Sequence, residues 1–133
     1  MTILVPVLAH IALVFMLFGW LSLARLRAVQ TGRTPFAAFE FGRDEPPAIA
    51  RITRNLANQF ELPVIFYACV ILLLQRGAVG PWDVAFAWLF FAGRVLHTGV
   101  QTLTGNVPLR GAAFAINAAA CAALAIHLAL VVL

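Results

Sequence analysis

Two long stretches without a charged residue constrain this chain more than any other feature. Residues 1–24 and 111–133 contain no Asp, Glu, Lys or Arg. A helix rises about 1.5 Å per residue, so each stretch is long enough to cross a hydrocarbon core of about 30 Å. The first stretch lacks the basic start and small-residue cleavage site of a signal peptide. We therefore expect both to be membrane spans.

The composition supports the same conclusion. The chain of 133 residues is 63% hydrophobic and only 11% charged, whereas about a quarter of the residues in a soluble domain are charged. We expect an integral membrane protein whose partners include membrane lipids and not nucleic acid. There is no lysine, and the nine basic residues are Arg25, Arg27, Arg33, Arg43, Arg51, Arg54, Arg76, Arg94 and Arg110. This bias fits a GC-rich genome, and a planar guanidinium also suits anion binding.

Two less uniform helices are predicted between the apolar ends. The double proline at 46–47 favours a helix start, and the pattern predicts a helix over 46–75. A third helix follows the Gly-Pro break and runs over 81–103, and a tight turn at 105–108 leads to the last span. With a loop at 30–45, the chain is predicted to be one all-α domain over 1–133. We expect an up-down four-helix membrane bundle.

The arginines also predict the orientation. Six lie in or beside the 30–45 loop, Arg94 and Arg110 flank the turn at 105–108, and only Arg76 lies on the opposite side. The positive-inside rule places both loops in the cytoplasm and both termini outside. We expect a bacterial inner-membrane protein. In this interpretation Arg25, Arg27, Arg33 and Arg43 anchor lipid headgroups.

Each of the two middle helices carries a polar face. At about 100° per residue, each face covers an arc of roughly 120°. The face on the second helix contains Arg51, Arg54, Asn55, Asn58 and Glu61. The face on the third contains Arg94, His97, Thr98, Gln101 and Thr104. Lipid cannot satisfy these groups, so both faces must meet protein or water.

The two faces are predicted to meet at one depth. Glu61 lies 14 residues after Pro47, and Arg94 lies 14 residues before Pro108, which places each roughly 21 Å from the cytoplasmic turns. An unpaired charge at such a depth is costly, so we predict a Glu61–Arg94 ion pair. Pro63 should bend the second helix just above the polar face.

Below this pair, the polar faces predict a cavity open to the cytoplasm. We expect Arg51, Arg54, Asn55, Asn58, His97 and Gln101 to line it, with Arg110 at its mouth. Counting Arg51, Arg54, Arg94 and Arg110 against Glu61, the site carries about three surplus positive charges. A ligand with carboxylates would balance them. The alternative is that these side chains pair with each other and only hold the bundle together.

Two motifs resemble the membrane-associated proteins in eicosanoid and glutathione metabolism, the MAPEG family. One is Arg51-x-x-Arg54-Asn55-x-x-Asn58-x-x-Glu61-x-Pro63, and the other is Gly93-Arg94-Val95-x-His97-Thr98 followed by Pro108-x-Arg110. The four-helix pattern is similar to a prokaryotic-type member along the whole chain. The resemblance implies a homotrimer that binds glutathione between subunits near the cytoplasmic face.

The resemblance also implies residue roles. Arg51, Arg54, Asn55, Asn58, Glu61, Arg94, His97 and Gln101 would bind glutathione as co-substrate, without a metal. Arg110 would be the catalytic residue, because a cation beside the thiol stabilises the thiolate. The thiolate would attack a hydrophobic small molecule, which makes the chain resemble a glutathione transferase or peroxidase. The family's pattern has tyrosine at Gln101 and Leu62 in some members, and arginine at Asn106 in prostaglandin synthase.

Other functions remain open at this point. The chain could be a non-catalytic bundle or an accessory subunit of a larger membrane complex, and a small anion carrier is a third interpretation. His10 and His127 lie toward the same end of the bundle, so a bis-histidine haem site is a weaker hypothesis. Cys69 and Cys121 lie in apolar helix and predict no disulfide.

Overall fold

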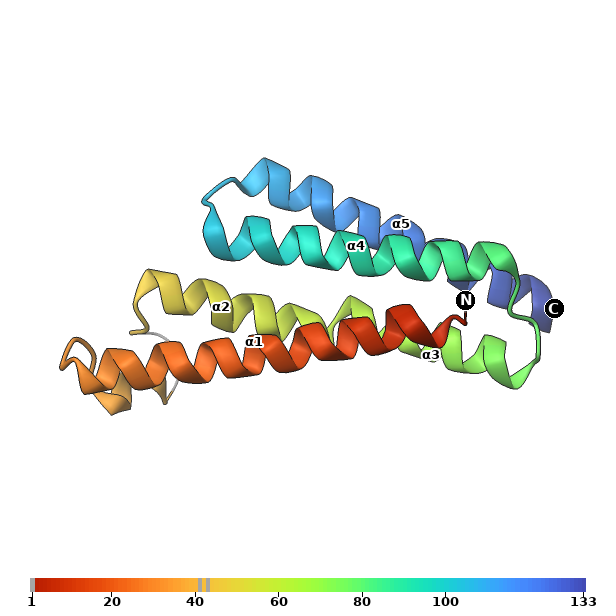
Figure 1. The fold of residues 1–133 in the computed structure, drawn as a ribbon. Coiled ribbons are helices and arrows are strands. Elements are labelled where there is room, and N and C mark those ends of the chain that lie inside the picture. The colour runs from red at the N-terminus through yellow and green to blue at the C-terminus, as the bar shows by residue number, and fades with distance from the viewer. Residues whose placement is uncertain (1, 41, 43) are drawn as a thin grey trace.

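The computed structural model describes residues 2–40, 42 and 44–133, and the described part is helical. Figure 1 shows an antiparallel up-down bundle with both termini at one end and the α1–α2 and α4–α5 connections at the other. Because α2 and α3 run in the same direction and together cross the bundle once, the chain forms a four-helix bundle, as predicted. The elements are α1 Leu4–Gln30, η1 Phe36–Phe39, α2 Pro47–Ala57, η2 Asn58–Phe60, α3 Leu62–Gln75, α4 Pro81–Leu103 and α5 Val107–Val132.

The first helix continues past the uncharged segment that predicted it. α1 includes Arg25 and Arg27 and ends only where Thr31 caps it and Gly32 takes a positive φ of 68°. A left-handed residue after the last turn is a common helix stop, and glycine adopts it without a steric penalty. Charge therefore marks where α1 leaves the apolar layer, whereas glycine marks where the helix ends.

The predicted bend near Pro63 is present, but it is a complete break in the helix. α2 ends at Ala57, a 3₁₀ turn covers Asn58–Phe60, and Glu61 has φ −100° and ψ −102°, outside the helical region. Pro63 has no N–H to donate to the carbonyl of Gln59, so a continuous helix would lose that bond. Pro63 instead lies in the first turn of α3, where no donor is required.

The bounds of α4 agree with the prediction, whereas α5 begins earlier than expected. The backbone N–H of Gly80 donates to Oδ2 of Asp83 at 2.7 Å and fixes the start of α4. At the next turn, the side chain of Asn106 accepts from the N–H of Leu109 at 2.9 Å. This cap places Pro108 in the first turn of α5, so the turn occupies residues 104–106 and the last span starts before residue 111.

The core holds α3, α4 and α5 together in the half of the bundle nearest the termini. α4 and α5 make the most extensive contact of any pair of helices. Phe66 of α3 and Phe90 of α4 are fully buried and stack with ring centroids 4.1 Å apart. On α4, Gly93 lies against the side chain of Asn117 on α5, and a Cβ at Gly93 would overlap it. The packing of α4 against Asn117 therefore requires a residue without a side chain at position 93.

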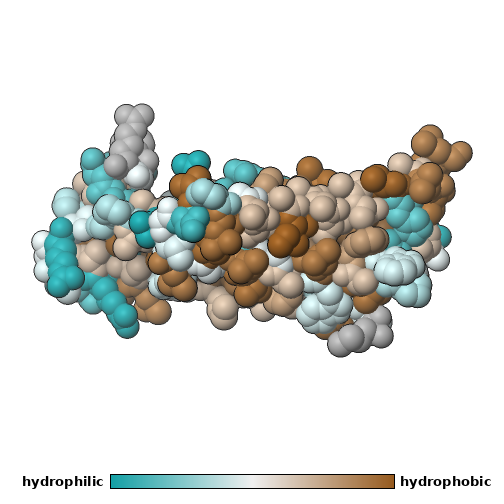
Figure 2. Space-filling view, turned by 90° about the horizontal axis from the view of Figure 1, so that it is seen from above, coloured by the Kyte–Doolittle hydropathy of each residue, from teal (hydrophilic) through white to brown (hydrophobic). Residues whose placement is uncertain are grey.

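Within the described residues, three helical segments are long and apolar enough to cross a membrane: Leu4–Gln30, Pro47–Gln75 and Val107–Val132. α4 is long enough, but polar side chains lower its hydropathy, and most of them are buried against the other helices. Figure 2 shows hydrophobic side chains over the middle of one face, with hydrophilic ones gathered mainly at the end that carries the connections. This distribution fits an integral membrane protein.

Candidate functional site

A network of buried side chains joins α1, η2, α3 and α4, and Gln59 is its centre. Oε1 of Gln59 lies 3.0 Å from Nε2 of His10 and 3.1 Å from Nε of Arg94. Because an amide oxygen only accepts, His10 donates from Nε2. The other nitrogen of the neutral ring, Nδ1, then accepts the hydroxyl proton of Tyr67 at 2.5 Å. Every hydrogen bond around His10 therefore has a defined direction.

The predicted Glu61–Arg94 ion pair is wrong. Arg94 is fully buried and donates instead to Oε1 of Gln59 and, through Nη2, to the backbone carbonyl of Asn58 at 3.0 Å. The 3₁₀ turn explains the change, because each 3₁₀ residue advances about 120° instead of 100°. Three such residues and the break at Glu61 leave its carboxylate beyond ion-pair distance of Arg94, and Glu61 is exposed.

Asn55 was predicted to line the cavity, and the structure contradicts this. Its side chain is completely buried. Oδ1 accepts from Nε2 of Gln59 at 3.2 Å and from the hydroxyl of Thr98 at 3.1 Å, and Nδ2 donates to Oε1 of Gln101 at 3.2 Å. Asn55 therefore connects the Gln59 network to Gln101.

Gln101 is the point where this network reaches a cavity. Its Oε1 accepts from both Asn55 and Asn58, at 3.2 and 3.0 Å. With the oxygen occupied by two donors, the amide NH₂ of Gln101 remains for a ligand, and Gln101 lines the cavity. The network therefore orients a hydrogen-bond donor toward this space.

Two adjacent cavities lie between α2, α4 and α5. One has a volume of about 380 Å³ and the other about 240 Å³. Arg54 and Arg110 line both, so the two spaces share a wall. The polar side chains of the larger cavity include Arg51, Gln101 and Thr104, and those of the smaller include Asn58, Glu61 and His97.

The combined site is cationic. Arg51, Arg54 and Arg110 form no ion pair with any residue that the structure describes. With Glu61 as the carboxylate in the lining, two positive charges are in excess. Arg94, which was counted in the predicted surplus, lines neither cavity.

His97 occupies the boundary between the smaller cavity and the bundle. Its ring lies 6.2 Å from that of Phe114 on α5, and its Nδ1 is buried without a hydrogen-bond partner in the described part of the chain. His97 therefore retains an unused polar atom next to a cationic space.

The sequence did not predict the contacts of Gln59, Tyr67 and His10. Gln59 follows Asn55 by one helical turn, and this spacing could have identified it. The haem hypothesis is wrong, because both nitrogens of His10 already have partners. His127 lies with its Nδ1 2.7 Å from Oδ1 of Asp83, as an ion pair when the ring is protonated.

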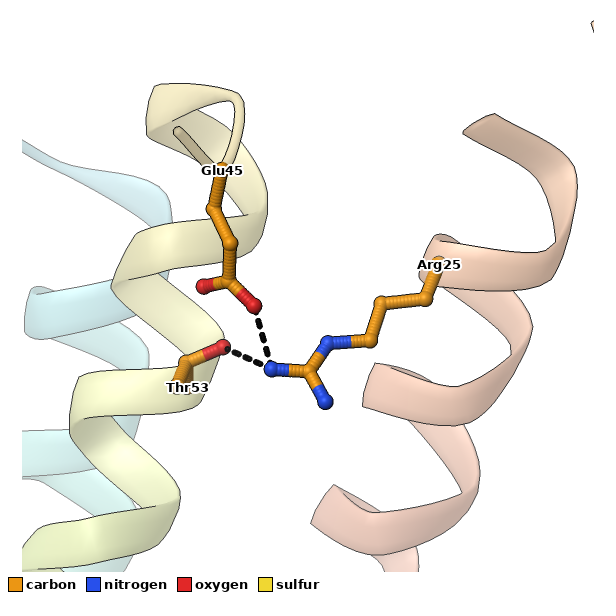
Figure 3. Close-up of polar contacts among 3 residues, drawn as sticks. All are labelled: Arg25, Glu45 and Thr53. Atoms are coloured by element: carbon orange, nitrogen blue, oxygen red, sulfur yellow. Dashed lines mark hydrogen bonds and ion pairs between the residues drawn. The ribbon is translucent and has the colours of Figure 1, made fainter. Parts of the chain in front are cut away.

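Arg25 does not act simply as a headgroup anchor. It forms an ion pair with the buried Glu45 and a hydrogen bond of 3.2 Å to Thr53, as Figure 3 shows. This contact joins the end of α1 to the start of α2. Arg27 and Arg33 are exposed, as an anchoring role requires, whereas Arg43 lies outside the described residues.

The fold and the site define a helical membrane-bundle protein with a cationic, amide-lined cavity near the end that carries its connections. A family model, that of the MAPEG family, matches residues 3–130, which is nearly the whole chain. The chain belongs to the MAPEG family, and the resemblance drawn from the two motifs is confirmed. No curated protein and no solved structure matches it.

Proposed function

We propose that this protein is a membrane-embedded, glutathione-dependent transferase or peroxidase acting on hydrophobic electrophiles. The observation that carries the proposal is the pair of arginines, Arg54 and Arg110, that lines both cavities without a carboxylate partner among the described residues. Glutathione has two carboxylates and one ammonium group. Three arginines and Glu61 complement those charges in sign.

The chemistry follows from the position of Arg110. A guanidinium next to the glutathione thiol lowers the energy of the thiolate, which is the nucleophilic form. In conjugation, the thiolate sulfur forms a bond to an electrophilic carbon, which releases its leaving group. In peroxide reduction, the thiolate sulfur bonds to one peroxide oxygen, the O–O bond breaks, and the released alkoxide takes a proton to leave as an alcohol. The thiolate of a second glutathione then attacks the sulfur of the resulting sulfenic acid, which loses its oxygen as water and gives the disulfide.

Calorimetric titration with glutathione tests the binding step. We expect the wild type to bind and an Arg54→Ala, Glu61→Ala double variant to lose most of the affinity. Arg27→Ala is the matched control, because Arg27 is exposed on α1 and lines neither cavity. Equal binding by the double variant and the wild type would remove glutathione from the proposal.

Ultraviolet absorbance of the thiolate tests the role of Arg110. We expect the thiolate band of bound glutathione in the wild type and its loss in Arg110→Ala. A band that survives this substitution contradicts the catalytic assignment of Arg110 without affecting the binding proposal.

The alternative function is a non-catalytic bundle or an accessory subunit of a larger complex. One observation favours it: Tyr67, the single tyrosine, bonds His10 and does not line either cavity. No aromatic hydroxyl of this subunit therefore assists the thiol. Turnover of a hydrophobic electrophile by the purified protein, absent in Arg110→Ala, would exclude this alternative.

We also propose a homotrimer with its cavities on the cytoplasmic side of a bacterial inner membrane. Family membership supports the trimer. The orientation is supported by six described arginines that lie on or beside the α1–α2 and α4–α5 connections, opposite the termini: Arg25, Arg27, Arg33, Arg51, Arg54 and Arg110. Native mass spectrometry tests the subunit number. A reporter active only outside the cytoplasm, fused to the C-terminus, tests the orientation and should be active.

A further inference from the structure

A separate cavity of about 600 Å³ lies between the last turns of α1 and the short helix η1. It shares no residue with the two cationic cavities. Its walls are mostly apolar, and its polar side chains are Ser22, Arg25 and Glu40. The apolar walls are formed mainly by Leu26, Val29, Phe36 and Phe39.

This cavity lies where α1 leaves the apolar layer. α1 has 27 residues, so it is about 40 Å long and exceeds a hydrocarbon core of about 30 Å. Arg25 is the first charged residue of the chain. In Figure 1 the end of α1 and η1 project beyond the α4–α5 connection. Phe36, on the rim, is 80% exposed, so its apolar ring is free to contact lipid. The cavity therefore lies at the level of lipid headgroups.

The rim carries one cation and one anion, each with capacity for a ligand. One terminal nitrogen of Arg25 contacts both Glu45 and Thr53, and Figure 3 shows no bond to the other terminal nitrogen. The guanidinium also lies 5.4 Å from the centroid of the Phe39 ring, which fixes its position over the cavity. Glu40 is exposed and forms no ion pair with the described residues.

We propose that this cavity binds one phospholipid of the surrounding bilayer, with a phosphoethanolamine headgroup. The phosphate accepts from the free terminal nitrogen of Arg25, and the primary ammonium donates to the carboxylate of Glu40. The glycerol end of an acyl chain packs between Leu26 and Phe36. Phosphatidylglycerol would leave Glu40 facing an anionic headgroup. Phosphatidylcholine has no N–H to donate to Glu40.

Native mass spectrometry of the purified protein tests this proposal, with phosphatidylethanolamine and phosphatidylglycerol of identical acyl chains in competition. We expect several-fold more bound phosphatidylethanolamine. Glu40→Gln should remove this preference, whereas Asp44→Asn, on the same connection but outside the cavity, should retain it. Equal retention of the two lipids by the wild type, or an unchanged preference in Glu40→Gln, overturns the proposal.

A second pair of variants locates the bound lipid. Leu26 and Leu23 are 51% and 54% exposed on α1, but only Leu26 lines the cavity. We expect Leu26→Trp to fill the space and lose the bound lipid, and Leu23→Trp to retain it. Lipid retained equally by both variants places the site elsewhere and contradicts the proposal. The exposed Glu40→Gln variant keeps the test decisive if Leu26→Trp does not fold.

Discussion

Oε1 of Gln59 lies 3.1 Å from Nε of Arg94 and is the acceptor that fixes this arginine inside the bundle. The same oxygen accepts from His10 of α1, so one amide, at the break between α2 and α3, links α1 to α4. No water is available in a hydrocarbon core to replace these bonds. Loss of this amide would therefore leave two buried donors without an acceptor.

Replacing Gln59 should destabilise the bundle. Gln59→Leu leaves Nε of Arg94 and Nε2 of His10 without an acceptor, and a buried group left unpaired costs about 1–3 kcal/mol, or more when it is charged. We expect a clear loss of thermal stability in detergent. Gln59→Glu should lose less, because a carboxylate still accepts from both.

Gln75→Leu provides the matched control for Gln59. Gln75 is the last residue of α3 and is exposed, so the same change in chemistry removes no buried partner. If Gln59→Leu and Gln75→Leu unfold at the same temperature, the network does not stabilise the fold.

Gly93 should not tolerate a side chain, whereas Gly99 should. A Cβ at Gly93 would overlap Oδ1 of Asn117, while a Cβ at Gly99, on the same helix, meets nothing within 4 Å. We expect Gly93→Ala to cost about 1–3 kcal/mol through overpacking, and Gly99→Ala to be neutral or to stabilise by up to about 1 kcal/mol.

Thermal unfolding of the two glycine variants checks this contrast. An Asn117→Ala substitution in the Gly93→Ala background should restore part of the lost stability, because it removes the overlapping atoms. A double variant less stable than the Gly93→Ala single variant would show that the contact is not the cause.

The helices were predictable from the sequence because their signals are strong and local. The Gly80-Pro81 break predicted the start of α4. The long apolar runs predicted the membrane spans at the two ends of the chain. The ends of α1 and the start of α5 were less accurate, because they depend on Gly32 and on the Asn106 cap. These are single-residue backbone features that a hydropathy pattern does not contain.

The candidate site was only partly predictable, for a physical reason. The polar faces of the second and third helices were identified, and Arg51, Arg54 and Arg110 do line the cavities. A rotation of about 100° per residue holds only in a continuous α-helix, so it misplaces the side chains after the 3₁₀ turn begins. Glu61 was therefore predicted beside Arg94, whereas Gln59 is the side chain that contacts this arginine.

Asp83 should stabilise the end of the bundle near the termini. Its carboxylate accepts from Gly80 N–H with one oxygen and contacts His127 with the other, and both contacts are 2.7 Å. Asp83→Ala removes a helix-start acceptor and a partner of His127, so we expect a loss of about 1–2 kcal/mol. Asp83→Asn should retain part of this stability.

Thermal unfolding of Asp83→Ala, His127→Ala and the double variant measures the contribution of the pair. The two single losses should exceed the loss of the double variant, since the contact is removed once. Simple additivity would show that Asp83 acts only through Gly80. Asp44→Ala, at an exposed carboxylate in the α1–α2 connection, is the control for removing a negative charge.

Changing the donor that Gln101 presents to the cavity should weaken anion binding without unfolding the protein. In Gln101→Glu, a carboxylate oxygen still accepts from Asn55 and Asn58, so thermal stability should change little. The free NH₂ becomes a second anionic oxygen, which repels a carboxylate ligand. We expect glutathione affinity to fall by about tenfold or more, since about 1.4 kcal/mol of lost binding free energy corresponds to tenfold. Calorimetric titration measures this loss.

Gln30→Glu, exposed at the same end of the bundle, adds the same charge outside the cavity and should leave affinity nearly unchanged. Wild-type affinity in Gln101→Glu would mean that the amide does not face the ligand, and equal losses in both variants would mean that long-range charge alone is responsible.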